Sequence, residues 1–216
     1  MLTENYLQDY LQEILPLCDG ILGDIQKESY KENVPIISND VVRLLSFVLS
    51  IKRPKKILEI GAAVGFSSGL MSKYLAKGGK ITTIDRFDIM IEHFKKNRKR
   101  LGLEEKIELI EGDACDILPK LNDKFDVIFL DAAKGQYIQM LPHCLRLLET
   151  GGILIVDDVL QEGRIARNRE DVPRRQRTIH TRMRKFLWEI THNDALETSV
   201  LTIGDGVALC HKIKDI

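Results

Sequence analysis

Short apolar strands alternate with amphipathic helices along most of this chain, from Lys56 onward. Such alternation is typical of a parallel sheet whose strands are joined by right-handed crossovers. The last two apolar segments differ, because only Gly204, Asp205 and Gly206 separate them, a gap too short for a crossover. We therefore predict an α/β fold with a mostly parallel, seven-stranded sheet that ends in an antiparallel hairpin. Strands are predicted at 56–60, 80–84, 106–110, 125–130, 152–156, 198–203 and 207–213, and helices at 67–76, 88–101, 137–148 and 171–192.

The first 52 residues carry helical patterns instead of strands. Apolar side chains recur there at helical spacing, and polar side chains stand where helices can be capped. Helices are predicted over 3–18, over 21–32 and from 38–40 onward. We expect a single domain over 1–216, with extra N-terminal helices in 1–52 and the α/β core in 53–216.

The composition narrows the class of protein. The chain has 216 residues, of which 44% are hydrophobic, enough for one domain with a full core. No apolar run approaches the roughly 20 residues that span a bilayer, and residues 1–5 lack the basic and apolar stretches of a signal peptide. The four cysteines have no C-x-x-C spacing, which favours buried thiols over disulfides or zinc ligands. We expect a cytoplasmic protein with no membrane segment.

A glycine loop and two aspartates follow the first three predicted strands. Gly61 and Gly65 allow the backbone to turn tightly and to approach a ligand. Ala63 replaces the middle glycine of the dinucleotide fingerprint, which argues against a pyrophosphate-binding dehydrogenase. A carboxylate at Asp85 could accept hydrogen bonds from a ribose diol, and Asp113 could accept one from the amine of an adenine. The alternative for each aspartate is the N-cap of a helix.

Three further acids and a lysine follow the next two strands. Asp131 ends the fourth strand and precedes Lys134, and Asp157 and Asp158 end the fifth. Carboxylate oxygens select Mg²⁺, Mn²⁺ or Ca²⁺ over zinc. A bound cation would lower the pKa of a coordinated hydroxyl and of Lys134, which could then act as a general base. The alternative is that Asp157 or Asp158 only caps a loop.

Positive charge is concentrated in residues 163–188, although the formal net charge of the chain is zero. This basic segment holds eight arginines and one lysine against two acids, so 9 − 2 = +7. Trp188 falls on the side of the predicted helix opposite Ile179, where it is expected to be partly exposed. Arginines with an aromatic side chain suit phosphates and an unstacked base. The alternative is a solvated helix face paired with acids elsewhere.

The glycine loop in 59–65, Asp85, and the segment 112–114 resemble the class I S-adenosylmethionine-dependent methyltransferases. The resemblance implies a Rossmann-like fold with S-adenosyl-L-methionine as cofactor, its methionine part on the loop, its ribose on Asp85 and its adenine on Asp113. The implied cofactor contacts are Val34, Glu59, Gly61, Gly65, Ser67, Asp85, Asp113, Ala114 and Asp131. Ser67 has a rival role as the N-cap of the following helix.

The pattern Asp131-x-x-Lys134, with a second acidic pair after the next strand, resembles the metal-dependent O-methyltransferases of the catechol and caffeoyl-CoA group. The resemblance implies Asp131, Asp157 and Asp158 as ligands of Mg²⁺, with Lys134 and Asp131 as the catalytic residues. This chain departs from the group at Asp158, where asparagine is usual. The extra negative charge is expected to tighten the metal or to retain a proton.

Segments 33–37, 131–137 and 204–208, together with the basic segment, resemble the bacterial tRNA 5-hydroxyuridine methyltransferases over nearly the whole chain. The resemblance implies methylation of the 5-hydroxyl of the wobble uridine to 5-methoxyuridine, the tRNA anticodon stem-loop as partner, and a homodimer. The expected RNA contacts are Arg164, Arg174, Arg175, Arg177 and Arg182. One alternative is a small-molecule O-methyltransferase acting on catechol-like diols, which need no polycation. Another is a non-catalytic RNA-binding module that kept the fold.

Overall fold

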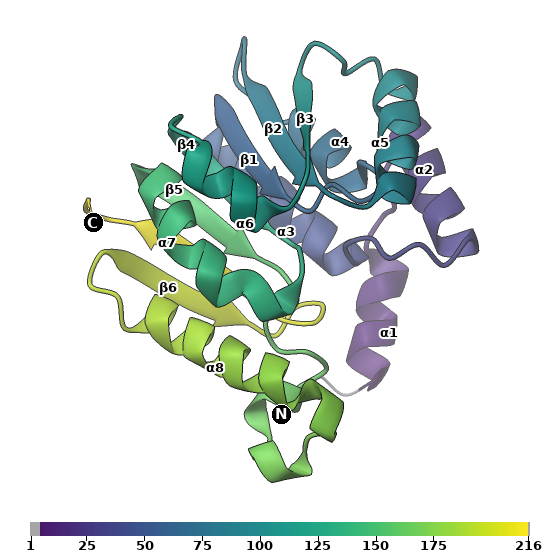
Figure 1. Ribbon diagram of the computed structural model, residues 1–216. Coiled ribbons are helices and arrows are strands. Elements are labelled where there is room, and N and C mark those ends of the chain that lie inside the picture. The colour runs from purple at the N-terminus through teal and green to yellow at the C-terminus, as the bar shows by residue number, and fades with distance from the viewer. Residues whose placement is uncertain (1–4, 216) are drawn as a thin grey trace. The chain divides into compact units, whose positions relative to one another are not determined.

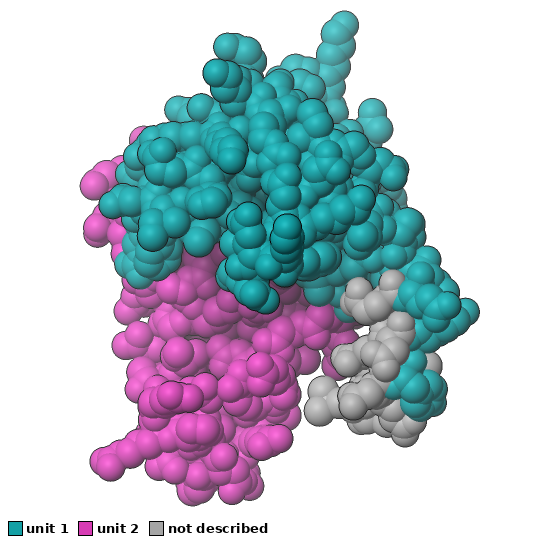
Figure 2. Space-filling view, turned by 90° about the vertical axis from the view of Figure 1, so that its right-hand side faces the viewer, with its two compact units in different colours: residues 1–112 teal, residues 113–216 magenta. Residues whose placement is uncertain are grey.

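The computed structural model describes residues 5–215. Residues 1–4 lie outside the described residues, and so does most of the stretch 1–5 on which the prediction of no signal peptide rests. The chain divides into two compact units, residues 1–112 and residues 113–216 (Figure 2). Seven strands form a mostly parallel sheet in the order β3-β2-β1-β4-β5-β7-β6 (Figure 1), which confirms the predicted α/β fold class. The single domain over 1–216 stays a prediction.

The first unit contains three parallel strands, with β2 paired to both β1 and β3. The strands are β1 (Lys56–Ile60), β2 (Lys80–Asp85) and β3 (Ile107–Glu111), and the helices are α1 (Asn5–Ile14), α2 (Gly20–Lys31), α3 (Asn39–Lys52), α4 (Phe66–Ser72) and α5 (Asp88–Arg100). All seven residues of α4 are buried, and α4 contacts α2, α3 and β2. This burial fixes the start of α4, which is where the glycine loop ends.

The helix α3 shows why the N-terminal region folds as it does. Val42, Leu45 and Leu49 recur at helical spacing, and all three side chains are fully buried. They form one apolar stripe, and α3 contacts α1 and α4. The three predicted N-terminal helices are therefore confirmed within the described residues, with α1 shorter than the predicted 3–18.

The second unit contains two parallel strands and the antiparallel hairpin. β4 pairs with β5 in parallel, β5 pairs with β7 antiparallel, and β7 pairs with β6 antiparallel, as predicted for the last two strands. The strands are β4 (Phe125–Leu130), β5 (Leu148–Val156), β6 (Leu196–Leu201) and β7 (Val207–Lys212). The helices are α6 (Ala114–Ile117), α7 (Tyr137–Leu147) and α8 (Arg177–Thr191), with short 3₁₀ turns η1 (Leu118–Lys120) and η2 (Lys134–Gln136). α8 contacts α7, η2 and β6 (Figure 1).

The prediction that the last long helix begins at 171 is wrong. α8 begins at Arg177, and the residues before it form three separate 3₁₀ turns, η3 (Arg164–Ala166), η4 (Arg169–Asp171) and η5 (Arg174–Gln176). Pro173 is the cause, because its ring disfavours helical backbone at the residue before it, and Val172 is extended with ψ 135°. The arginines ahead of α8 therefore lie on turns instead of on a helix face.

The predicted fifth strand, 152–156, is longer in the structure. β5 begins at Leu148, and its register against β4 shifts between the pairs Phe125–Leu148 and Val127–Ile153. Gly151, with a φ of 81°, lies in this irregular part, so the glycines mark a bulge as well as the end of the preceding helix. None of the four cysteines forms a disulfide, and the predicted burial holds for Cys144 and Cys210 but not for Cys18 and Cys115, which are half-buried. In residues 5–215, no helix combines the length and apolar character needed to cross a membrane.

Candidate active site

The glycine loop between β1 and α4 requires its glycines. Gly61 has a φ of 102° and Gly65 a φ of 80°, in the left-handed region that side chains disfavour. A Cβ atom at Gly65 would lie 2.9 Å from a ring carbon of Phe94, so a side chain there would also clash. Gly65 is the N-cap of α4, which means that the rival prediction of Ser67 as the cap is wrong.

Asp85, at the end of β2, holds this loop closed. Its Oδ2 accepts hydrogen bonds from the backbone N–H groups of Ala62 and Ala63, at 3.0 and 2.8 Å. Its Oδ1 accepts from the N–H groups of Arg86 and Phe87, at 2.7 and 3.0 Å. The carboxylate is therefore not the N-cap of α5, and the structure gives it a loop-closing role. The predicted contact between Asp85 and a ribose stays a prediction.

Glu59 is a fully buried carboxylate that ties β1 to its neighbours. It accepts a hydrogen bond from the hydroxyl of Ser67 at Oε1 and from that of Thr83 at Oε2, each 2.5 Å long. Two hydroxyl donors satisfy a buried charge that would otherwise be costly. Thr83 is a site residue that the sequence analysis missed, and its signal is a polar side chain within the buried stretch of β2.

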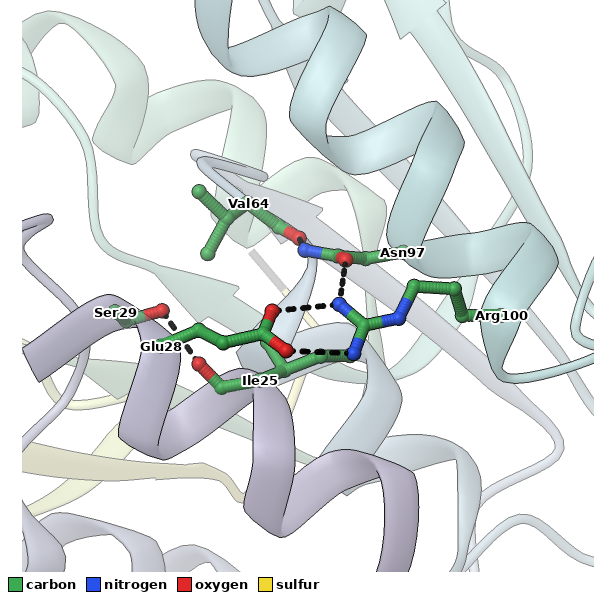
Figure 3. Close-up of polar contacts among 6 residues, drawn as sticks. All are labelled: Ile25, Glu28, Ser29, Val64, Asn97 and Arg100. Carbon is green, nitrogen blue, oxygen red and sulfur yellow. Dashed lines mark hydrogen bonds and ion pairs between the residues drawn. The ribbon is translucent and has the colours of Figure 1, made fainter. Parts of the chain in front are cut away.

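The outer side of the glycine loop is fastened by α5 and α2, as Figure 3 shows. The side-chain amide of Asn97 donates to the carbonyl oxygen of Val64 at 3.0 Å. The guanidinium of Arg100 in turn donates to the side-chain oxygen of Asn97 at 3.1 Å. It also makes a bidentate ion pair with the carboxylate of Glu28, at 2.6 and 2.8 Å. Val34 lines the hollow beside these residues together with Val64. Asn97 was not predicted as a site residue, because one asparagine in a basic helix carries no sequence signal.

Asp113 takes the role that the alternative assigned to it. It is the N-cap of α6, and its side chain accepts a hydrogen bond from the N–H of Cys115 at 2.8 Å. Ala114 is the first residue of that helix. A capping carboxylate keeps further lone pairs, so the predicted contacts of Asp113 and Ala114 with the cofactor's adenine stay predictions.

The second unit brings the remaining acids and the lysine together. Leu130 pairs with Val156 in the parallel β4–β5 ladder, so Asp131 and Asp157 follow partner residues at the same edge of the sheet. The ammonium of Lys134 lies 2.5 Å from Oδ2 of Asp158 and 3.5 Å from Oδ1 of Asp131. Asp157 Oδ1 accepts a hydrogen bond of 2.8 Å from the N–H of Asp158. The predicted convergence of these four residues is therefore seen.

Negative charge in this cluster exceeds what Lys134 neutralises. Burial, followed by the charges of Asp131 and Asp158, raises the pKa of Asp157 to about 8. Burial also raises the pKa of Asp131, although Lys134 opposes the shift. Burial alone would lower the pKa of Lys134, but the neighbouring carboxylates outweigh it and the pKa is raised. The lowered lysine pKa is predicted for the site with a bound cation, so it stays a prediction.

The cluster has the donor chemistry of a hard-cation site. All its ligand atoms are carboxylate oxygens, and burial, followed by the charges of Asp131 and Asp158, disfavours the ionised form of Asp157, which a cation would stabilise. In residues 5–215, no three acidic, histidine or cysteine side chains are placed so that they could hold a metal ion. Lys134 occupies the space between Asp131 and Asp158 instead, so the donors fit a divalent cation in kind but are paired with an ammonium group.

Tyr137 fixes the two loops that carry these acids. Its buried hydroxyl accepts a hydrogen bond from the N–H of Ala132 and donates one to the carbonyl oxygen of Asp157, both 3.2 Å long. Its ring packs edge-on against Phe186 of α8, with centroids 5.6 Å apart. Tyr137 has no predicted role, although a phenol at the start of an apolar helix needs a hydrogen-bond partner and is a sequence signal for one.

The basic segment contacts the lysine turn directly. Arg182 donates to the carbonyl oxygen of Gly135 at 3.1 Å, in the turn that begins at Lys134. Arg164 and Arg177 donate to carbonyl oxygens of residues three to seven positions before them in the chain, whereas the Arg174 and Arg175 side chains are exposed. Three of the five predicted RNA contacts therefore also brace the protein. Their contacts with RNA stay predictions.

Comparison with known protein families gives one match over nearly the whole chain. A family model described as O-methyltransferase matches residues 17–213. A caffeoyl-CoA O-methyltransferase from Populus kitakamiensis is 32% identical, with the match covering 84% of this chain and 78% of that protein. A catechol O-methyltransferase from Niastella koreensis is 28% identical, with 93% of each chain covered.

Comparison with solved structures gives matches of the same kind. A putative caffeoyl-CoA O-methyltransferase from Staphylococcus aureus is 28% identical and superimposes with a TM-score of 0.84, over 98% of this chain and 100% of that one. The S-adenosylhomocysteine-bound methyltransferase PaMTH1 of Podospora anserina, at 23% identity and a TM-score of 0.85, covers 98% of this chain and 95% of its own. The second likeness supports the fold.

Proposed function

The chain belongs to the O-methyltransferase family and transfers a methyl group from S-adenosylmethionine, and from that premise we propose that its acceptor is the 5-hydroxyl of 5-hydroxyuridine at the tRNA wobble position. The product would be 5-methoxyuridine. The observation that carries this proposal is the contact between Arg182 and the carbonyl oxygen of Gly135, because it joins the basic segment to the turn of Lys134. A polyanionic acceptor would explain why so much positive charge is attached to that turn.

The charge distribution supports a nucleic acid over a small acceptor. The basic segment carries a local charge of +7, from 9 − 2, on a chain with a formal net charge of zero. Arg174 and Arg175 are exposed on the turn before α8. Phosphate contacts by such side chains supply much of the affinity of proteins for nucleic acids. Unpaired bases in loops, such as an anticodon loop, are the usual targets of sequence-specific RNA recognition.

The residues of the second unit have separate roles in the proposed reaction. Asp131, Asp157 and Asp158 would hold a Mg²⁺ ion, which lowers the pKa of a bound hydroxyl and of a lysine beside it. The amine of Lys134 takes the proton from the acceptor hydroxyl. The acceptor oxygen then bonds to the methyl carbon as the carbon–sulfur bond breaks, leaving S-adenosylhomocysteine. Tyr137 keeps the loops of Asp131 and Asp157 in place.

We also propose that the protein acts as a homodimer. Several apolar side chains of the first unit are exposed, including Tyr10 and Ile14 of α1 and Phe47 and Ile51 of α3. Exposed apolar side chains gathered on two contacting helices are typical of a protein–protein contact surface. Sedimentation analysis should give twice the mass of one chain, 24.7 kDa, and a monomer at micromolar concentration would reject this part of the proposal.

The second candidate function is methylation of a small catechol-like diol. The names of the relatives favour it, because they include caffeoyl-CoA and catechol O-methyltransferases. The chemistry of Lys134 and the three aspartates serves either acceptor equally. What separates the two candidates is the basic segment, which a catechol does not need.

The deciding experiment presents both acceptors to one enzyme. Purified protein with S-adenosylmethionine and Mg²⁺ is given an anticodon stem-loop containing 5-hydroxyuridine, the same stem-loop with uridine, or a catechol. We expect 5-methoxyuridine only from the first. Replacing Arg174 and Arg175 by glutamate should abolish that reaction, whereas replacing the exposed Lys77 and Lys99 by glutamate, two lysines far from the basic segment in sequence, should leave most of it. Turnover of catechol that is indifferent to Arg174 and Arg175, with no RNA product, would establish the second candidate instead.

A further inference from the structure

Trp188 is an exposed aromatic ring held in a fixed orientation. It is the only tryptophan of the chain and is 63% exposed on the outer face of α8. The imidazole of His192, four residues later, stacks against it with centroids 3.6 Å apart and planes 15° from parallel. The imidazole therefore covers one face of the indole, and the remaining parts of the side chain account for its exposure.

The imidazole behind the indole is itself held in place. Nδ1 of His192 lies 3.1 Å from the carbonyl oxygen of Trp188 and 3.0 Å from the hydroxyl of Thr191. The Thr191 hydroxyl also donates to the carbonyl oxygen of Leu187, at 2.7 Å. These contacts at the end of α8 restrain the imidazole ring, so the two stacked rings form a rigid surface feature with little rotamer freedom left to lose on binding.

Two positively charged side chains lie beside this pair of rings. Arg184 and Lys185 precede Trp188 by four and three residues, which places them beside it on the helix, and both are exposed. Trp188 also lies six residues after Arg182, about 9 Å further along the helix from the contact with Gly135. A flat aromatic surface next to cations at such a distance suits a nucleotide that neighbours the reacting one.

We propose that Trp188, backed by His192, is a stacking platform for an unpaired base of the RNA substrate. The proposal rests on the proposed function, because only an RNA acceptor has a second base to offer. Aromatic rings bind bases through their faces without regard to sequence, and the adjacent Lys185 would meet the phosphate of the same nucleotide. The platform would hold the substrate strand outside the reacting position, so it would add affinity without contacting the reacting atoms.

Tryptophan fluorescence tests this proposal directly, because Trp188 is the sole source of the signal. A fluorescently labelled anticodon stem-loop reports RNA binding by anisotropy, and an unlabelled one is titrated while tryptophan emission is recorded. We expect saturable quenching with the same dissociation constant in both measurements. Trp188→Ala should weaken binding of the stem-loop by about 5- to 100-fold, Trp188→Phe should restore most of the affinity, and His192→Ala should give a smaller loss than Trp188→Ala.

Two controls separate stacking from other causes. Tyr30→Ala removes another exposed aromatic ring, 46% exposed, from α2 and should leave RNA affinity unchanged. A blunt RNA duplex without unpaired bases should bind with much less quenching than the stem-loop. Anisotropy showing tight RNA binding with unchanged tryptophan emission, or with unchanged affinity of Trp188→Ala, would overturn the platform and leave the proposed function standing. Absence of any RNA binding by the wild-type protein would overturn both.

Discussion

The phenol of Tyr137 and the carbonyl oxygen of Asp157 are joined by a hydrogen bond of 3.2 Å. The same phenol accepts a hydrogen bond from the N–H of Ala132, next to Asp131. One buried side chain on α7 thus connects the loops that follow two neighbouring strands. Asp131 raises the pKa of Asp157, so this connection holds together two groups that repel each other once both are ionised.

Tyr137→Phe should loosen this connection while keeping the core packed. The ring and its edge-on contact with Phe186 remain, so we expect a loss of about 1–3 kcal/mol in the free energy of unfolding, from two hydrogen bonds. Affinity for Mn²⁺, measured by electron paramagnetic resonance of the free ion, should fall, and so should kcat. Tyr74→Phe, a half-buried tyrosine of the first unit, is the matched control. Unchanged Mn²⁺ affinity in Tyr137→Phe would contradict a positioning role.

Lys134 is predicted to act as a general base, which requires a neutral amine, and not only as a positive charge. Lys134→Arg keeps a cation between Asp131 and Asp158 but provides no base at neutral pH, so it should retain most of the stability and lose kcat by about 100-fold or more. Lys134→Ala should lose both kcat and stability, while calorimetry shows nearly normal S-adenosylmethionine binding. An arginine variant that turns over at the wild-type rate would show that only the charge is needed.

The sequence predicts the strands and the acid cluster because both follow from local pattern. An apolar strand that ends on Asp131, and the next on Asp157, can be recognised without any knowledge of packing, and adjacent parallel strands bring their ends together. The short Gly204–Gly206 link likewise determines the hairpin, since no crossover fits it. These predictions depend on residues close together in the chain, together with one general rule of sheet topology.

What the sequence could not provide are contacts between distant side chains. Asn97 supports the glycine loop from 33 residues away, and Thr83 binds Glu59 from 24 residues away, with no spacing that would indicate either pair. The raised pKa of Lys134 depends on how burial balances against carboxylate charge, which only the geometry decides. The start of α8 differs for another reason: a helix beginning at 171 would place Pro173 in its first turn, but the residue before it, Val172, is extended.

Asp157 should make the metal-free protein less stable as the pH rises. Its pKa is raised from an ordinary 3.8 to about 8 in the folded state, so between these values the folded protein holds a proton that the unfolded chain has released. The free energy of unfolding therefore falls from about pH 4 to pH 8 and levels off above, by a few kcal/mol. The raised pKa of Asp131 acts in the same direction. The raised pKa of Lys134 acts only near and above pH 10.5, outside this window.

Urea unfolding in EDTA at several pH values checks this expectation. Wild type should lose stability between pH 5 and pH 8, and Asp157→Asn, which cannot ionise, should remove most of the slope. Adding Mg²⁺ at pH 8 should stabilise the wild-type protein and have little effect on the variant. A wild-type stability that stays level or rises over this range would show that Asp157 is already ionised in the folded protein.

Gly65→Ala should damage the glycine loop for two separable reasons. The backbone φ of 80° is strained for alanine, and the added Cβ would lie 2.9 Å from the ring of Phe94. Gly78→Ala is the matched control, because Gly78 has a φ of 75° but nothing within 4 Å of an added Cβ. We expect about 1 kcal/mol of destabilisation in Gly78→Ala from strain alone, and about 2–4 kcal/mol in Gly65→Ala from strain and overpacking together. Only Gly65→Ala should weaken S-adenosylmethionine binding, measured by calorimetry. Equal losses of stability in the two variants would mean that Phe94 moves aside. The close approach of its ring would then not explain why residue 65 is a glycine.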